Sequence, residues 1–163
     1  MSARVVAIRM AKERMKFSAA HFTLFSATER ERLHGHNYRV EVTLTTEVGE
    51  DGISFDYARA KQLITALCEE LDEWMLIPEH SPHLRLEEQG DRLLVHFADE
   101  CIPFLQRDVK RLPVRNITLE ELSGYFIDRL QAETAFMQAN AIRRLEVFVS
   151  SGDGQQVGSV RDL

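Results

Sequence analysis

The chain has 163 residues, of which 44% are hydrophobic and 28% charged, a balance typical of one globular domain spanning residues 1–163. Its formal net charge is -6, and Lys and Arg are scattered, which argues against nucleic acid or an anionic membrane surface as the main partner. No apolar run approaches the ~20 residues of a membrane span, and the N-terminus lacks the apolar core of a signal peptide, so we expect a cytoplasmic protein.

The first half of the chain predicts strands followed by a helix. Residues 5–10 are rich in β-branched and apolar side chains, and residues 16–18 favour an extension of that strand. Residues 37–46 alternate apolar and polar side chains, which is the period of a half-buried strand. A turn at Gly49–Gly52 leads to a helix over residues 57–74, where apolar residues recur at helical spacing.

The region after this helix predicts short strands and a loop. Pro78 and Pro82 mark the loop, because proline lacks the amide donor that strands and helices use. Residues 93–97 are apolar enough to form a strand, and residues 109–114 indicate another short one.

A capping box opens the second helix, because Thr118 and Glu121 have the T-x-x-E spacing. This helix runs to about Met137, and residues 145–149 form a last strand that ends at the turn 151–154. Strand pairs separated by two helices predict an α+β fold, with two helices packed on one face of an antiparallel sheet.

Three histidines form the candidate metal site. Residues two apart in an extended segment point to the same face, so His34 and His36 project together while Gly35 points away. His21 ends the first strand segment, which can pair with the strand after His36 and add a third nitrogen. Three protein ligands with one open position are the arrangement of a catalytic zinc site. Alone, an H-G-H tripeptide is also compatible with a surface turn. The other histidines lack such spacing and are interpreted as structural or solvated: His80, His83 and His96.

The pair of segments that carries these histidines resembles the 6-pyruvoyl-tetrahydropterin synthase and 6-carboxytetrahydropterin synthase family. The segments are FSAAH at 17–21 and LHGHNY at 33–38. The similarity extends along nearly the whole chain, through G-x-x-x-D at 52–56, Leu-Asp-Glu at 71–73 and N-x-T-x-E-x-L at 116–122.

This resemblance implies the tunnelling fold, an antiparallel sheet with two helices on one face. In that family, trimers form a barrel and two trimers stack into a hexamer. The resemblance also implies a zinc cofactor and a pterin-binding site between subunits, and therefore a homo-oligomer, either a trimer or a hexamer.

The sequence departs from the family where a Cys usually precedes H-G-H. Here Glu31 stands three residues before His34, in an E-x-x-H-G-H arrangement that resembles a subgroup associated with forming 6-hydroxymethyl-dihydropterin for folate synthesis. A carboxylate near zinc and a pterin side chain can act as a general base. The alternative is that Glu31 belongs to a solvated charge run at 29–32.

A second departure replaces the family's Leu-Asp-His by Leu71-Asp72-Glu73. If both carboxylates face the pocket, like-charge repulsion holds one of them protonated, and the pair is a candidate for moving protons. Alternatively, Asp72 and Glu73 flank a helix end in solvent.

The third departure concerns the anchor of the pterin, for which the family often uses a Glu in the last strand. The matching place here is Ser150 or Ser151, and we assign Ser150. A hydroxyl cannot make the same charged two-point contact. Thr118 and Glu120 complete the expected substrate-binding set, although Glu120 can instead complement the helix dipole.

The leading functional hypothesis is a zinc-dependent lyase acting on the side chain of a reduced pterin that resembles dihydroneopterin triphosphate. Its pathway is tetrahydropterin, folate or queuosine-type biosynthesis, and Arg30 or Arg32 is a candidate contact for the triphosphate. The alternatives are a zinc-loaded pterin- or purine-binding homologue without the family's catalysis, and an enzyme with an altered substrate.

Overall fold

The computed structural model describes residues 4–163, which form an α+β fold of ten strands and three helices. The first half contains β1 (Arg4–Met10), β2 (Lys16–His21), β3 (His34–Val48), α1 (Tyr57–Leu71) and β4 (Trp74–Pro78). The second half contains β5 (Leu84–Gln89), β6 (Arg92–Phe97), β7 (Glu100–Leu105), β8 (Val109–Leu112), α2 (Leu119–Gln131), α3 (Thr134–Ala139), β9 (Arg144–Gly152) and β10 (Gln155–Asp162).

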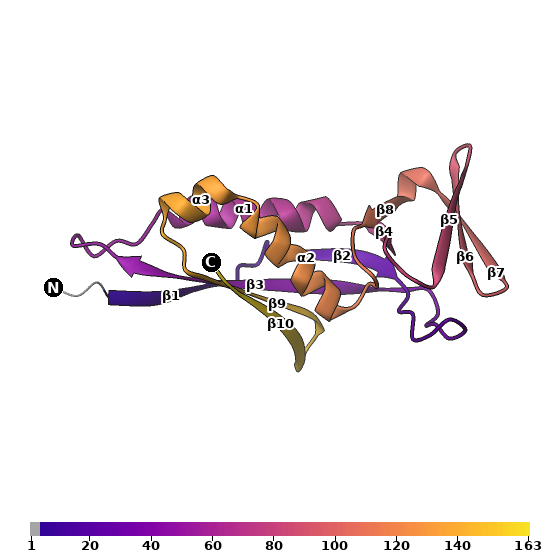
Figure 1. The fold of residues 1–163 in the computed structure, drawn as a ribbon, viewed down its shortest axis with the longest axis horizontal. Coiled ribbons are helices and arrows are strands. Elements are labelled where there is room, and N and C mark those ends of the chain that lie inside the picture. The colour runs from indigo at the N-terminus through magenta and orange to yellow at the C-terminus, as the bar shows by residue number, and fades with distance from the viewer. Residues whose placement is uncertain (1–3) are drawn as a thin grey trace.

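The long strand β3 organises a seven-stranded sheet, as Figure 1 shows. The strand order is β10-β9-β3-β2-β4-β8, and β1 also pairs with β3. The prediction of an antiparallel sheet is wrong for one part of it, because β4 runs parallel to both β2 and β8. The sheet is therefore mixed: its antiparallel part joins β1, β2, β3, β9 and β10, and its parallel part extends from β2.

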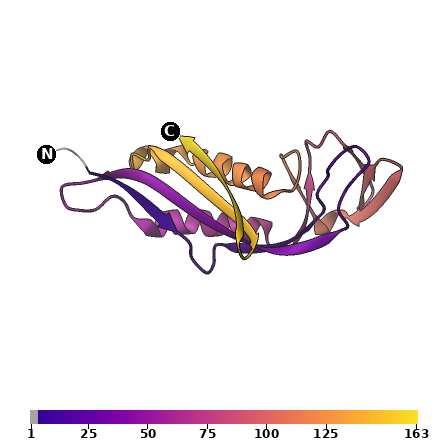
Figure 2. The same ribbon diagram turned by 90° about the horizontal axis from the view of Figure 1, so that it is seen from below.

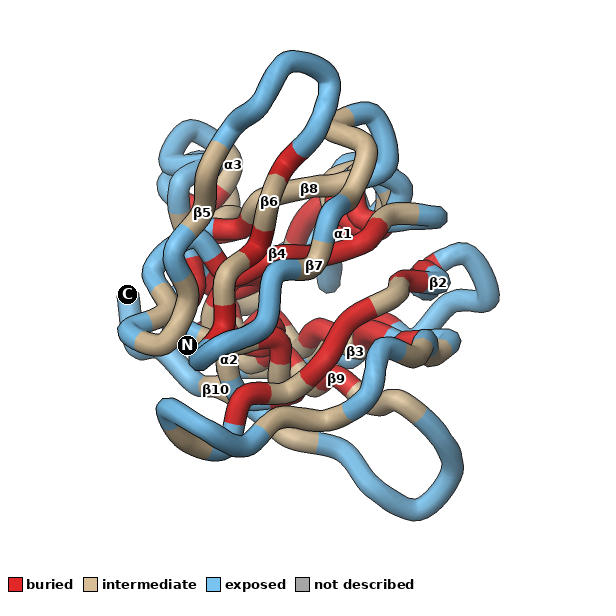
Figure 3. The backbone as a smooth tube through the Cα atoms, turned by 90° about the vertical axis from the view of Figure 1, so that its right-hand side faces the viewer, coloured by how far each residue is buried: buried red, intermediate tan, exposed pale blue. Residues whose placement is uncertain are grey.

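The helices α1 and α2 cover one face of this sheet, as predicted, and the strands lie in front of them in the view from below (Figure 2). Buried segments of the strands and helices meet in one interior layer (Figure 3). The apolar residues of each helix recur at helical spacing, which is why one stripe of each faces the sheet. Within residues 4–163, no helix is long and apolar enough to cross a bilayer.

A second sheet, β5-β6-β7, lies at one end of the molecule (Figure 1). Strand β6 confirms the predicted strand at 93–97, whereas β5 and β7 were not predicted. The inner face of this sheet packs on the end of the main sheet through a separate apolar cluster that includes Phe22, Leu24 and Phe97. This cluster supports the long connection between β2 and β3.

The first helix is shorter than predicted, because it ends at Leu71 and not at Trp74. Asp72 is extended, with φ -73° and ψ 135°, and Glu73 has a φ of 63°. The chain therefore reverses out of the helix, and Trp74 begins β4. The sequence analysis placed Pro78 in a loop. In the structure, Pro78 is instead the last residue of β4.

The prediction of one helix to Met137 is also wrong, because α2 ends at Gln131 and α3 begins at Thr134. Glu133 breaks the helix with a ψ of 56°. The turn at 151–154 is a hairpin that continues into β10, a strand that the sequence analysis missed.

Gly158 of β10 faces the Phe148 ring of β9, and a Cβ at Gly158 would lie 2.4 Å from Phe148 Cε1. Replacing Gly158 with Ala therefore forces the ring out of its position. We expect the free energy of unfolding to fall by about 1–3 kcal/mol, measured by urea denaturation.

Gly124→Ala is the matched control for this substitution. Outside the helix's own backbone, no heavy atom of the described residues lies within 4 Å of a Cβ at Gly124 of α2. Ala is favoured over Gly inside a helix by about 0.5–1 kcal/mol, so Gly124→Ala should be neutral or stabilising. Wild-type stability of Gly158→Ala would contradict the close packing of Phe148.

Candidate metal centre and its pocket

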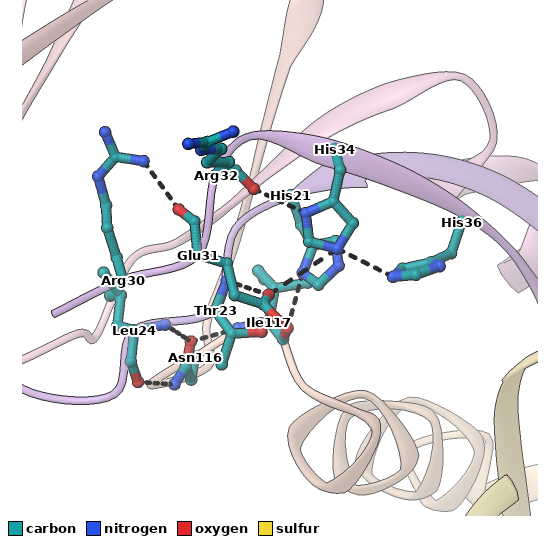
Figure 4. Close-up of polar contacts among 10 residues, drawn as sticks. All are labelled: His21, Thr23, Leu24, Arg30, Glu31, Arg32, His34, His36, Asn116 and Ile117. Atoms are coloured by element: carbon teal, nitrogen blue, oxygen red, sulfur yellow. Dashed lines mark hydrogen bonds and ion pairs between the residues drawn. The ribbon is translucent and has the colours of Figure 1, made fainter.

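The strands β2 and β3 bring three imidazole rings together, as Figure 4 shows. His21 is paired with His34 in the antiparallel register, and His36 follows two residues later on the same face of β3. Their ligating nitrogens all lie within 4.8 Å of one another, so the group could hold a metal ion. A Cβ at Gly35 would lie 3.1 Å from the Ala19 carbonyl oxygen, and glycine leaves that approach between the strands open.

Backbone carbonyls fix which nitrogen of two of these rings is free. His21 Nδ1 lies 3.0 Å from the Ile117 oxygen, and His34 Nδ1 lies 2.7 Å from the Arg32 oxygen. A carbonyl oxygen only accepts, so each Nδ1 carries the hydrogen and each Nε2 presents a lone pair. This is the arrangement in which a carbonyl orients a metal-binding histidine.

The free nitrogens form a set that suits a cation. Two nitrogens bound at about 2.0–2.1 Å to one tetrahedral ion lie about 3.3 Å apart, close to the 3.0 Å between His34 Nε2 and His36 Nε2. His21 Nε2 is buried without a hydrogen-bond partner among the described residues, which costs about 1–3 kcal/mol. A metal ion would satisfy this atom.

Burial also keeps His21 neutral. Desolvation, with smaller contributions from His34 and His36, lowers the pKa of His21 to about 4. Neutral imidazole is the form that binds metals, so His21 does not have to lose a proton to act as a ligand at neutral pH.

Glu31 lies beside the histidines, with Oε2 at 3.8 Å from His34 Nε2. The Thr23 amide donates to Glu31 Oε2 at 3.0 Å, and the Glu31 amide donates to the Thr23 oxygen at 2.8 Å. Partial burial on its own raises the pKa of Glu31, but hydrogen bonds from Thr23 and the nearby histidines outweigh it and hold that pKa below its ordinary value. Glu31 is therefore a fixed carboxylate next to the metal ligands.

A cavity of about 210 Å³ unites most of the predicted site residues. His21, His36 and Glu31 line it on one side, and the start of α2 lines it on the other. There the Thr118 hydroxyl accepts from the Glu121 amide at 3.3 Å, which confirms the helix cap. The residues that contribute to this cavity are His21, Thr23, Glu31, His36, Tyr38, Ile117, Thr118, Leu119, Glu120, Ser151, Gln155 and Val157.

Ser151 and not Ser150 lines this cavity, which corrects our choice between the two. Ser150 pairs with Arg39, and both side chains lie on the face of the sheet opposite to that of the buried pair Val40 and Val149. Ser151 stands where the register between β9 and β10 shifts, and it lines the cavity together with His21 and His36.

The adjacent carboxylates Asp72 and Glu73 are not brought to this cavity. Asp72 Oδ1 accepts from the Ser18 amide at 2.7 Å, and the Glu73 amide donates to the Ser18 oxygen at 2.7 Å. Glu73 lines a second cavity of about 520 Å³ together with Ser18 and Asp108, and His36 lines both cavities. Within one chain, Glu73 and Glu31 therefore belong to different cavities.

The Arg30 side chain is held by contacts within the chain. Its guanidinium pairs with Glu100, donates to the Glu31 oxygen at 2.8 Å and lies over the rings of Phe22 and Phe97. This side chain is an anchor of the loop that carries Glu31. Arg32 is exposed and is the freer of the two arginines considered as phosphate contacts.

Sequence reasoning missed the residues that orient these groups. Thr23 and Ile117 act through backbone atoms, which nearly every residue type has, so the sequence does not identify them. Asn116 bonds the loop through its carboxamide, and its place in the N-x-T-x-E segment is the signal that could have identified it. Tyr38 also lines the cavity, and burial raises the pKa of its hydroxyl well above the ordinary value.

A family model described as 6-pyruvoyl tetrahydropterin synthase matches residues 10–158. The chain belongs to this family. A putative 6-carboxy-5,6,7,8-tetrahydropterin synthase of Methanocaldococcus jannaschii is 28% identical over 142 residues, 86% of each chain. The crystal structure of 6-pyruvoyl tetrahydropterin synthase from Plasmodium vivax has a TM-score of 0.92 at 27% identity and covers 98% of this chain and 99% of its own.

A further structure of the Plasmodium vivax synthase carries Ala in place of a glutamate that is described as a catalytic residue. It is 26% identical, with a TM-score of 0.92 and coverage of 98% of this chain and 99% of its own. Together these relatives make the chain a lyase of the 6-pyruvoyl/6-carboxy-tetrahydropterin synthase type, and they confirm the resemblance seen in FSAAH and LHGHNY.

The unpaired nitrogen of His21 predicts that metal binding stabilises this synthase. Adding a divalent transition metal to the metal-free protein should raise its Tm, since a ligand at 100 times its Kd adds about 2.7 kcal/mol to the stability. His36→Ala should show a much smaller rise, because one of the three nitrogens is lost. Scanning calorimetry with and without metal measures both.

His80→Ala is the control, because His80 is exposed and lies outside the metal-binding group. It should keep the full rise in Tm. An equal rise in wild type and His36→Ala would exclude the three-histidine site.

Proposed function

We propose that this synthase is a zinc-dependent lyase that acts on the side chain of a reduced pterin resembling dihydroneopterin triphosphate. The observation that carries the proposal is the position of Glu31, a carboxylate 3.8 Å from His34 Nε2 at the edge of the cavity. Three imidazoles with no carboxylate or thiolate among them favour zinc, held by His21, His34 and His36 with one position left for the substrate.

Glu31 is the proposed general base. Its lowered pKa keeps it ionised at neutral pH, and the two hydrogen bonds with Thr23 fix its direction. It would take a proton from a carbon of the pterin side chain that lies between it and the histidines. When bound, zinc would polarise the side-chain oxygens as a Lewis acid. The catalytic glutamate described in the Plasmodium vivax synthase supports a carboxylate in this role.

The substrate-binding residues proposed are Thr118, Glu120 and Ser151. Glu120 lies on the first turn of α2 and is exposed, and within residues 4–163 nothing pairs with its carboxylate, which would accept from ring N–H groups. Ser151 stands on the strand where the family often carries a Glu, so Glu120 becomes the main charged acceptor for the pterin. The ring would then lie between α2 and the end of β9.

Glu31→Gln tests the mechanism, because an amide keeps the shape and cannot accept the proton. We expect turnover of dihydroneopterin triphosphate to fall by at least about 100-fold, within the range that general-base catalysis contributes. Zinc content should stay at the wild-type level. Product formation by mass spectrometry and zinc by elemental analysis are the two measurements.

Glu29→Gln is the matched control, since Glu29 lies exposed on the same loop. It should keep wild-type turnover. Full activity in Glu31→Gln would remove Glu31 from the mechanism. Tight binding of the pterin by the wild type without any turnover would favour the second candidate, a zinc-loaded pterin- or purine-binding homologue. The observation that supports this candidate is the Ser at the position where the family often carries the anchoring Glu.

We further propose that Asp72 and Glu73 serve the site of a neighbouring subunit in a cytoplasmic homo-oligomer, a trimer or a hexamer. The cavity at the histidines measures about 210 Å³, below the ~300–1,000 Å³ of complete ligand pockets. Glu73 lines a second cavity, and Asp72 holds the turn that presents it. A second chain would enlarge the first cavity and bring another carboxylate to it.

Mixing two inactive variants tests this sharing of the site. Glu31→Gln and Glu73→Gln should each be inactive alone, because each lacks one proton-transfer group at every site. Mixed oligomers should regain activity at about a third of their sites in a trimer and about a quarter in a hexamer, where both wild-type carboxylates meet across one interface.

Coexpression with two affinity tags isolates the mixed oligomers for the turnover assay. Homo-oligomers of each variant, purified in the same way, provide the baseline. Activity in the mixture no higher than this baseline would contradict a site that is shared between subunits.

A further inference from the structure

Asn116 joins two separate parts of the chain at the metal centre. Its Oδ1 accepts from the Leu24 amide at 3.1 Å and from the Ile117 amide at 3.0 Å. Its Nδ2 donates to the Leu24 oxygen at 2.8 Å. One carboxamide thus pairs with both backbone groups of Leu24, as a neighbouring strand would, and Figure 4 shows it between the loop and Ile117.

The loop side of this contact leads directly to Glu31. Leu24 is buried at 5% exposure and follows Thr23 in the chain. Thr23 in turn holds the Glu31 carboxylate through its amide and receives the Glu31 amide at its oxygen. Any shift of Leu24 therefore moves the donor that fixes Glu31.

The other side of the contact leads to His21. Asn116 accepts from the amide of Ile117, and the carbonyl of that same residue accepts from His21 Nδ1 at 3.0 Å. The carbonyl sets the tautomer and the direction of the ring. Asn116 is therefore one residue away from the group that orients a candidate metal ligand, and one residue away from the group that orients the candidate base.

We infer that Asn116 is a positioning residue that holds Glu31 and His21 in one geometry. The roles of these two residues rest on the proposed function, whereas the clamp itself rests on the three hydrogen bonds. Only a carboxamide fits here, because the site requires an acceptor for two amides and a donor for one carbonyl. Aspartate keeps the shape but turns the donor into a charged acceptor facing the Leu24 oxygen.

Two variants of Asn116 test the inference in the zinc-loaded protein. Asn116→Ala removes all three bonds, and Asn116→Asp removes the donor while keeping the volume. In both, we expect affinity for Zn²⁺ to fall by about 10-fold, the lower end of the effect of losing an orienting group, because the Ile117 carbonyl itself is kept. Competition with a chromophoric chelator measures this affinity.

Amide hydrogen exchange and kinetics provide two further measurements. Exchange in the peptide covering residues 22–33 should be at least about tenfold faster than in the wild type, because local opening loses its restraint. With dihydroneopterin triphosphate, kcat should fall by at least about tenfold while KM changes much less, since Asn116 is not among the residues that line the cavity.

Asn140→Asp is the matched control. Asn140 is similarly half-buried and donates from Nδ2 to the Phe136 oxygen at 2.7 Å, at the end of α3 and outside the cavity. It should lower the overall stability without changing zinc affinity, exchange at 22–33 or kcat.

Wild-type zinc affinity and exchange in a folded Asn116 variant would overturn the inference, and so would equal losses in Asn140→Asp. If Asn116→Ala does not fold, Asn116→Asp carries the same measurements. Zinc affinity and amide exchange test the role of Asn116 without any catalysis. Absence of turnover in the wild type would therefore contradict the proposed function and not the role of Asn116.

Discussion

The antiparallel register of β2 and β3 decides the direction of every imidazole at the metal centre. His21 stands opposite His34, and the next pair on the same face joins Ala19 to His36. A slip of β2 by one residue would turn His21 to the other side of the sheet, away from His34 and His36. Below the histidines, Phe17 and Tyr38 are the next pair on this face, and their rings stack with centroids 4.8 Å apart. The apolar core thus fixes the register that the polar site requires.

The spacing of apolar residues in the sequence predicted those helices and strands in which the spacing repeats over several helical turns or strand residues. The alternation at 37–46 and the helix cap at Thr118 both have counterparts in the structure, although the Glu121 carboxylate bonds the Arg115 amide and not that of Thr118. The pattern failed where distant contacts decide. Trp74 continues the helical spacing, but Asp72 bonds Ser18 and directs the chain into a strand beside β2. Parallel pairing of β4 with β2 and β8 depends on partners far apart in sequence, which no local period reports.

The same division applies to the site. The three histidines could be predicted because two of them lie two residues apart on a strand and the third ends its partner. The choice between Ser150 and Ser151 depended on the pairing of β9 with β3, which the sequence leaves open by one residue. The orienting groups at Thr23 and Ile117 are backbone atoms, and any residue type can present them. Their positions become visible only when the loop closes on the start of α2.

An uncharged imidazole and a charged carboxylate, both unprotonated, lie side by side in this small volume. Burial keeps His21 neutral, which leaves its Nε2 lone pair available to a cation. Hydrogen bonds from Thr23 keep Glu31 ionised a few ångströms away. A metal ligand must be unprotonated and a general base must be unprotonated, so both requirements are met at the same neutral pH. The loop that carries Glu31 has to be held firmly against β2, because Thr23 and Ile117 set the directions of the carboxylate and the imidazole.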